Sequence, residues 1–590
     1  MMFTTRKFIQ SLIFSLLALG LCYAGIEPKE TNTLSATKGS TAIKTSALAS
    51  SDMTALSRVD FSKLLLEASK KLGNRPLPLL TIEGESLPKL LQKVVQVADK
   101  MLPDCSAVLS LAITGFAGGV SCPGVDEKAG CYVVVFFNDG NVEPVFLFKA
   151  QQGCALVKSL EENKGTTNVL KSKPSNKSTQ DILKPEPCWY VYGSAALVGI
   201  LDNNLEQIFP FICEEKSSDT CLKIGLDFNL WNNIFQKIES KEVTFLKFLW
   251  DILVMPDIEK VGIGFDIVDK TLETTMFVCP RAYRPLSAFA KSLESKSKEI
   301  RFLNWSSREV VQELVFQDYS GLKNYVESLD SRIKYNQSTE DFCSIFKNAW
   351  ALICPLIKDV LAFCAENFTG NAQSYADFQI QKDLVSSKGF GFFEGVQLKR
   401  DTLLKFVDDF SDKLKSSVKG LVDKKLFGWE IYKDLSLNIK RSVEKHHDCD
   451  IDQVFWKCNG NEAYYPIWFA ICKNYLLYAD DISNLKRLIE RMEEMKEPSY
   501  MPREEDCFSR AKMDFISVLH TLGVELPKPI SALSFEIACG LKDGIFVNTI
   551  KVPGFLDIFS LKTILPSADE NAKKDDVNHS NNLKAVSVEK

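Results

Sequence analysis

The stretch Tyr464–Met492, YYPIWFAICKNYLLYADDISNLKRLIERM, combines the two patterns that decide the fold. An apolar, strand-like run leads to a Lys473-Asn474 turn and then to a second short apolar run, which predicts two strands joined by a tight turn. Asp480 and Asp481 precede a run with apolar residues at helical spacing, and aspartate is favoured immediately before a helix. The stretch therefore predicts a strand–turn–strand–helix unit.

Three stretches of the first half match three stretches of the second half in the same order. CWYVYGSAALVGILDNNLEQIF from Cys188 parallels the unit quoted above, CLKIGLDFNLWNNIF from Cys221 parallels RAKMDFISVLHTL from Arg510, and KVGIGFDIVDKTLETTMFVCP from Lys260 parallels SALSFEIACGLKDGIFVNTIKVP from Ser531. We interpret the matches as an internal duplication. The alternative is that any protein of mixed strands and helices yields such matches by eye.

The rest of the chain shows the same kinds of pattern, predicted helices and predicted pairs of strands. Helical patterns begin at Phe61, Leu87, Gly321 and Ile345, and CYVVVFFNDGNVEPVFLFKA from Cys131 is a predicted hairpin about an Asp-Gly turn. Neighbouring strands joined by tight turns pair antiparallel, and helices then cover a face of the sheet. We predict an α+β fold of two related domains, each a mostly antiparallel sheet covered by helices on one face.

The N-terminus carries the pattern of an export signal. Arg6 and Lys7 precede the apolar stretch Phe8–Leu21, and the small residues at Cys22 and Ala24 predict cleavage after Ala24. A membrane anchor and lipidation of Cys22 are the alternatives. The predicted division is 1–24 signal peptide, 25–52 flexible linker, 53–298 first domain, 299–565 second domain and 566–590 disordered tail.

Composition narrows the class of partner. The chain has 590 residues and a formal net charge of −5, which gives no basic surface for nucleic acid. Beyond the signal peptide we find no uninterrupted apolar segment of membrane-spanning length, so we expect the mature chain not to span a membrane. The cysteine content permits disulfides in an exported protein, and the local pairs to test are Cys213 with Cys221 and Cys449 with Cys458.

One cluster has the side chains of a metal site. EKHHDCDID offers nitrogen, oxygen and sulfur donors at His446, His447, Asp448 and Cys449. Adjacent residues of a strand point to opposite faces, and we find no second ligand pair. The competing interpretation is a solvated polar loop closed by a Cys449–Cys458 disulfide. We identify no catalytic residues and no cofactor motif, because the common nucleophile, phosphate-loop and zinc-protease motifs are missing.

The strand–turn–strand–helix units resemble those of uncharacterised bacterial exported proteins, which are defined only as domains of unknown function. The run WFAICKNYLLYADDISNLKRLIERM carries their recurring pattern at Asn474, Leu476, Ala479, Leu485 and Leu488. The resemblance implies export and a fold, and it supplies no catalytic residue.

The patterns together favour a non-catalytic exported protein of the periplasm or cell envelope with a binding or structural role. Its expected partner is an envelope protein, a lipid or a peptide. One alternative is a hydrolase, possibly metal-dependent, with a site near His446 and His447. A second alternative is a carrier of an apolar ligand between the sheet and its helices.

Overall fold

The computed structural model describes most of the chain between residues 61 and 555. The described ranges, apart from short gaps within them, are 61–162, 167–170, 188–194, 222–237, 247–297, 301–304, 310–336, 341–424, 435–495, 499–517 and 534–555. The predicted signal peptide, linker and tail lie outside them, as do Cys213 and Cys221.

The described elements alternate between helices and strands. The helices are α3 (Phe61–Lys71), α4 (Leu87–Met101), α5 (Pro103–Ala117), α6 (Ala155–Glu162), α8 (Phe228–Lys237), α10 (Pro285–Ser297), α11 (Tyr319–Tyr335), α12 (Asp341–Asn367), α13 (Arg400–Asp423) and α14 (Ile482–Glu494), with a π-helical turn at Trp250–Val254. The strands are β1 (Leu77–Gly84), β2 (Cys131–Asn138), β3 (Asn141–Ala150), β4 (Thr167–Leu170), β5 (Cys188–Tyr192), β6 (Leu222–Asp227), β7 (Ile258–Val268), β8 (Thr271–Pro280), β9 (Arg301–Leu303), β10 (Val311–Phe316), β11 (Phe368–Gln381), β12 (Leu384–Gly395), β13 (Ser436–His446), β14 (Cys449–Cys458), β15 (Asn461–Cys472), β16 (Tyr475–Ala479), β17 (Tyr500–Pro502), β18 (Cys507–Asp514), β19 (Ser534–Lys542) and β20 (Ile545–Val552). The α+β class is thus confirmed.

The opening stretch folds as its sequence predicts. β15 and β16 are joined by a two-residue turn in which Lys473 has a φ of 53°. Asp481 caps α14, because its side chain accepts hydrogen bonds from the backbone N–H groups of Ser483 and Asn484. The strand–turn–strand–helix unit is therefore confirmed.

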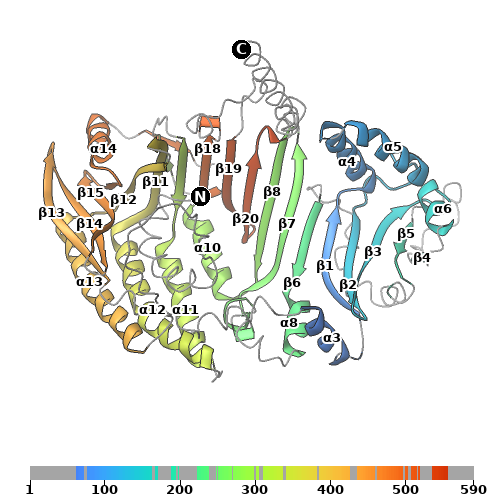
Figure 1. The fold of residues 1–590 in the computed structure, drawn as a ribbon, viewed down its shortest axis with the longest axis horizontal. Helices are drawn as coiled ribbons and strands as arrows, with labels where there is room; N and C mark the ends of the chain where they lie inside the picture. The colour runs from blue at the N-terminus through green and yellow to red at the C-terminus, as the bar shows by residue number, and fades with distance from the viewer. Residues whose placement is uncertain are drawn as a thin grey trace, which may run out of the picture.

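The strands do not form two separate sheets. Apart from the short β9–β17 pair, the described strands make one antiparallel sheet of 18 strands. From one edge to the other the pairing order is β13-β14-β15-β16-β12-β11-β10-β18-β19-β20-β8-β7-β6-β1-β2-β3-β5-β4. The two halves of the chain meet where β20 pairs with β8, with Thr549 opposite Thr275 (Figure 1).

The strand order is the same on both sides of this junction. Outward from it, the first half runs β8-β7-β6-β1-β2-β3-β5 and the second half runs β20-β19-β18-β10-β11-β12-β16. The matched residues Asp227 and Asp514 each end their strand, and they lie opposite Lys260 and Ser534 in the next strands. The two Asp residues thus occupy corresponding strand ends in the two halves.

Helices pack on both faces of the sheet in the second half. Leu476 and Tyr478 of β16 point into the core formed with α11, α12 and α13, whereas Leu477 and Ala479 point into the core formed with α14. Alternate residues of a strand face opposite sides, so α14 lies across the sheet from the other three helices. The prediction of helices on one face is wrong here because β16 is apolar on both of its faces.

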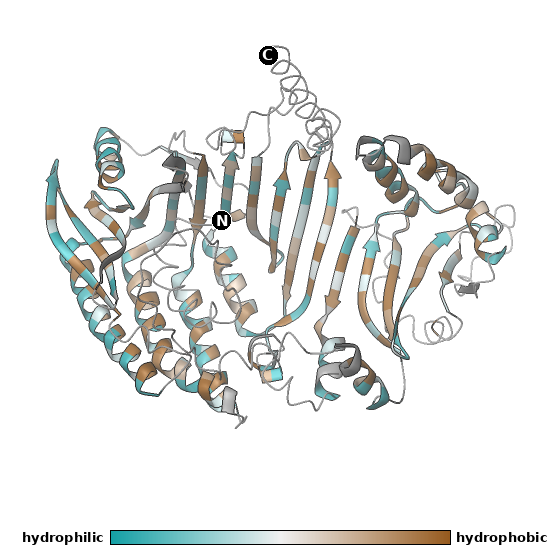
Figure 2. Cartoon of the chain, viewed as in Figure 1, coloured by the Kyte–Doolittle hydropathy of each residue, from teal (hydrophilic) through white to brown (hydrophobic). Residues whose placement is uncertain are grey.

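Helix α12 is both long and apolar. Its segment Cys343–Asn367 is long and apolar enough to span a membrane by length and composition, and half of its most apolar window is buried. Leu356, Val360 and Leu361 pack in the core with α11 and α13. Figure 2 shows the apolar colouring of α12 against the mixed colouring of α11 and α13. Part of its apolar surface therefore lies in the protein core.

Helix α10 belongs structurally to the second half. Ala290 and Leu293 pack with Phe316 of β10 and Leu541 of β19. The predicted boundary between 298 and 299 assigned this helix to the first half. In the structure this helix packs on β10 and β19.

Candidate functional site

The predicted metal cluster is a tight hairpin. β13 ends at His446, residues 447 and 448 form the turn, and β14 begins at Cys449. The expectation of a solvated loop closed by a Cys449–Cys458 disulfide is wrong. The two cysteines are the first and last residues of β14, so their Cα atoms are about 30 Å apart at about 3.3 Å per residue, far beyond disulfide reach.

The two histidines lie together at this hairpin. Their ring centroids are 4.7 Å apart, and His446 Nε2 is 3.0 Å from Glu490 Oε1 of α14. The side-chain ligand atoms of His446, His447 and Glu490 all lie within 4.8 Å of one another. The rule that adjacent residues point to opposite faces fails here, because His447 lies in the turn with a φ of 49°. The exposed Asp448 is in neither of the two ligand groups found among the described residues.

Cys449 belongs to a second ligand group with two residues that the sequence did not single out. Its sulfur, that of Cys472 and a carboxylate oxygen of Glu493 lie within 4.8 Å of one another. Cys472 donates a hydrogen bond to Glu493 Oε1 across 3.2 Å. The side-chain hydrogen bond between the two cysteines lowers the pKa of Cys449 against the effect of burial. The same interaction raises the pKa of Cys472, and burial and Glu493 add to the rise.

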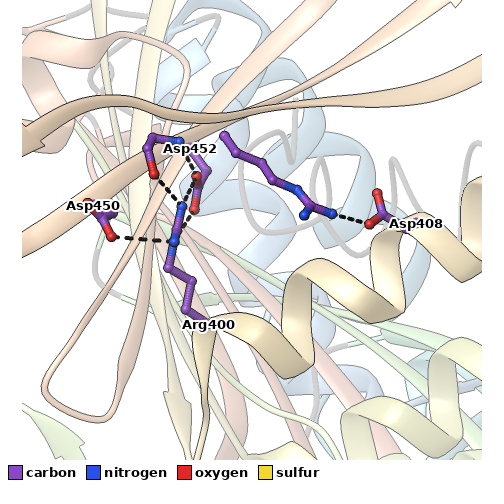
Figure 3. A network of polar contacts seen from close by, with 6 residues as sticks. Arg400, Asp408, Asp450 and Asp452 are labelled. Carbon is purple, nitrogen blue, oxygen red and sulfur yellow. Dashed lines mark hydrogen bonds and ion pairs between the residues drawn. The ribbon is translucent and has the colours of Figure 1, made fainter.

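A buried ion pair holds the hairpin from the opposite face of the sheet. Arg400, the first residue of α13, donates to both carboxylate oxygens of Asp452 at 2.8 and 2.6 Å (Figure 3). The Asp452 side chain is 1% exposed and also accepts from the backbone N–H of Ser442 at 2.7 Å. Ser442 lies where the β13–β14 register shifts, with a φ of 45°. The ion pair therefore fixes the irregular part of the hairpin.

A second candidate site is a groove over the junction of the two halves. It has a volume of about 420 Å³ and runs over β8, β18, β19 and β20. Four of its five charged side chains pair across neighbouring strands: Arg510 with Glu536 at 3.8 Å and Lys551 with Glu273 at 3.5 Å. These side chains are 25% to 47% exposed, so they remain accessible to a partner.

A third space lies between the sheet and helices α12 and α13. It is lined only by apolar side chains and cysteine, among them Phe363, Phe393 and Phe406. Its volume of about 40 Å³ is enough for a few water molecules and too small for a lipid chain. Packing fills this region as a core.

The chain matches no known protein-family model, no curated protein and no solved structure.

Proposed function

We propose that this is a non-catalytic exported protein that binds a protein or peptide partner on the groove over β8, β18, β19 and β20. The observation that carries the proposal is the groove itself, which lies on the strands that join the two halves. Its volume is within the range of about 300–1,000 Å³ that ligand sites occupy. Its charged lining suits a polar partner rather than a lipid.

The repeated strand order supports an origin by internal duplication. The two copies of the strand order meet where β8 pairs with β20. The groove lies over this junction. A duplicated chain gains a shared surface at such a junction that a single copy lacks. The groove is therefore a binding surface that forms only where the two copies meet.

Export is the second part of the proposal and rests on the N-terminal sequence. Cleavage after Ala24 gives a mature chain that begins at Gly25, located in the periplasm or associated with the envelope. N-terminal sequencing of the protein purified from its native cells should therefore begin at Gly25. A chain that keeps Arg6 and Lys7 and stays in the cytoplasm would contradict the proposal.

Site-specific photo-cross-linking tests the binding role. A photoreactive amino acid at Thr549, which lines the groove, should give discrete cross-linked species in intact cells. The control is the same group at Tyr335, at the end of α11 and 85% exposed. Charge reversal by Lys551→Glu should weaken the species seen at Thr549. Equal cross-linking at both positions, insensitive to Lys551→Glu, would overturn the binding role.

One observation favours a second candidate function. The contact of His446 with Glu490 is the pairing of a base with an orienting carboxylate that hydrolases use. A hydrolase with its site at His446 and His447 would lose activity on His446→Ala and retain its fold. The carrier function has no comparable support, because the apolar space measures only about 40 Å³.

A further inference from the structure

Three potential ligands form a row across the edge of the sheet. His446 of β13 lies directly opposite Cys449 of β14. In the next pair of strands, β14 and β15, Ile451 is opposite Ala470. The same register, continued by two residues on each strand, places Cys449 opposite Cys472. Directly opposed residues of antiparallel strands point to the same face. The imidazole and both thiols therefore lie on one side of the sheet.

Helix α14 places carboxylates against this row. Glu490 and Glu493 are three residues apart, so they lie on the same side of the helix. Glu490 contacts His446, and Glu493 accepts the hydrogen bond from Cys472. The cysteines are 6% and 1% exposed, whereas Glu493 is exposed, so the group is buried on one side and open on the other.

We propose that Cys449, Cys472 and Glu493 form a zinc-binding site, with His446 beside its open fourth position. Thiolates are soft ligands that select zinc over calcium or magnesium, and zinc sites combine Cys, His and carboxylate ligands in tetrahedral geometry. Ligand atoms of such a site are about 3.3–3.8 Å apart, given bond lengths of about 2.0–2.3 Å. The three atoms already lie within 4.8 Å of one another. Binding requires movements of about 1 Å.

The binding step balances without an oxidant. The two thiols lose their protons to solvent, both sulfurs and one carboxylate oxygen bond Zn²⁺, and the hydrogen bond from Cys472 to Glu493 is replaced by metal bonds. The site goes beyond the proposed binding function, since it lies near the sheet edge at β13 and the groove lies at the sheet centre. It joins β14, β15 and α14, so bound zinc ties the helix to the strands.

Metal uptake by the full chain tests the site. The protein is reduced, freed of metal and titrated with Zn²⁺, and with Co²⁺ as a spectroscopic probe. We expect one metal per chain and the thiolate-to-cobalt charge-transfer band. Cys449→Ser and Cys472→Ser should abolish the band, and Glu493→Gln should weaken zinc binding at least about ten-fold. Cys364→Ala removes a buried thiol of the α12 core and should leave the band unchanged.

Glu493→Gln keeps the test decisive if the cysteine variants do not fold, since Glu493 is exposed. Its neighbour Glu494, also exposed on α14, provides the matched control Glu494→Gln, which should bind zinc as the unaltered chain does. If the reduced chain does not take up zinc, the site is overturned. This holds also if peptide mapping of the isolated protein finds a Cys449–Cys472 disulfide. Equal zinc binding by Glu493→Gln and Glu494→Gln removes Glu493 as a ligand and overturns it as well.

Discussion

The buried pair of Arg400 and Asp452 gives the sharpest stability prediction. Asp452→Asn keeps the shape of the side chain and removes its charge. Arg400, 27% exposed, then keeps the longer ion pair with Asp450 at 3.4 Å and the hydrogen bond to Ser442 Oγ at 2.9 Å. Breaking a buried ion pair from one side costs about 3–5 kcal/mol, and the partial exposure of Arg400 places the expected loss near the lower end, at about 3 kcal/mol.

The matched control is Asp359→Asn. Asp359 pairs with Lys413, also on α13, at 2.6 Å, but the two side chains are 38% and 58% exposed. An exposed pair contributes at most about 1 kcal/mol, so this variant should stay close to the unaltered protein. Guanidinium denaturation followed by ellipticity compares the two variants.

Two further measurements locate the effect. Amide hydrogen exchange should accelerate over residues 436–458 in Asp452→Asn, because the pair fixes the β13–β14 hairpin. The double variant Arg400→Met with Asp452→Leu should recover part of the lost stability, since it leaves no unpaired buried charge. If Asp452→Asn destabilises the protein no more than Asp359→Asn, the pair does not anchor the hairpin and the reasoning is refuted.

Three other variants test single contacts. Asp481→Ala removes the N-cap of α14 and should cost about 1 kcal/mol, measured by thermal denaturation, with no change if the cap is dispensable. Gly262→Ala would place a Cβ 1.9 Å from the Phe277 ring and should cost about 1–3 kcal/mol, whereas an unchanged denaturation midpoint would show that the ring moves aside freely. Burial alone would raise the pKa of Asp318, but hydrogen bonds, first that from Lys296, lower it on balance, so its stabilising effect is present above about pH 4 and is lost as the pH falls through the folded-state pKa. The stability difference from Asp318→Asn should therefore shrink below about pH 4, and a difference that persists into acid would contradict this assignment.

The sequence by itself determined the local units. Asp-Gly turns and an Asp before an apolar helical run have local physical causes, namely tolerance of positive φ and side-chain capping. Asp139 accordingly adopts a φ of 48° in the predicted hairpin turn, Asp543 has a φ of 54° in the Asp-Gly turn between β19 and β20, and Asp481 caps α14. The run NYLLYA from Asn474 also held a signal for burial on both faces, because apolar residues follow one another in it without alternation.

Only the tertiary structure decided how these units assemble. The pairing of β8 with β20 joins strands far apart in the chain, and no local pattern specifies it. The row of ligands depends on the register between β14 and β15. Next to the turn, Cys458 is opposite Asn461. Between this pair and the Val454–Ile467 pair, two irregularities shift the register by two residues.

Counting from the turn would place Cys449 opposite Ala470. The shifted register places it opposite Cys472, and α14 then adds Glu493. A register shift of one residue changes the face of every side chain, and a shift of two restores the face and changes the partner. The sequence could therefore name His446, His447 and Cys449 as candidates, but their partners were set by bulges and helix packing, which depend on contacts between distant parts of the chain.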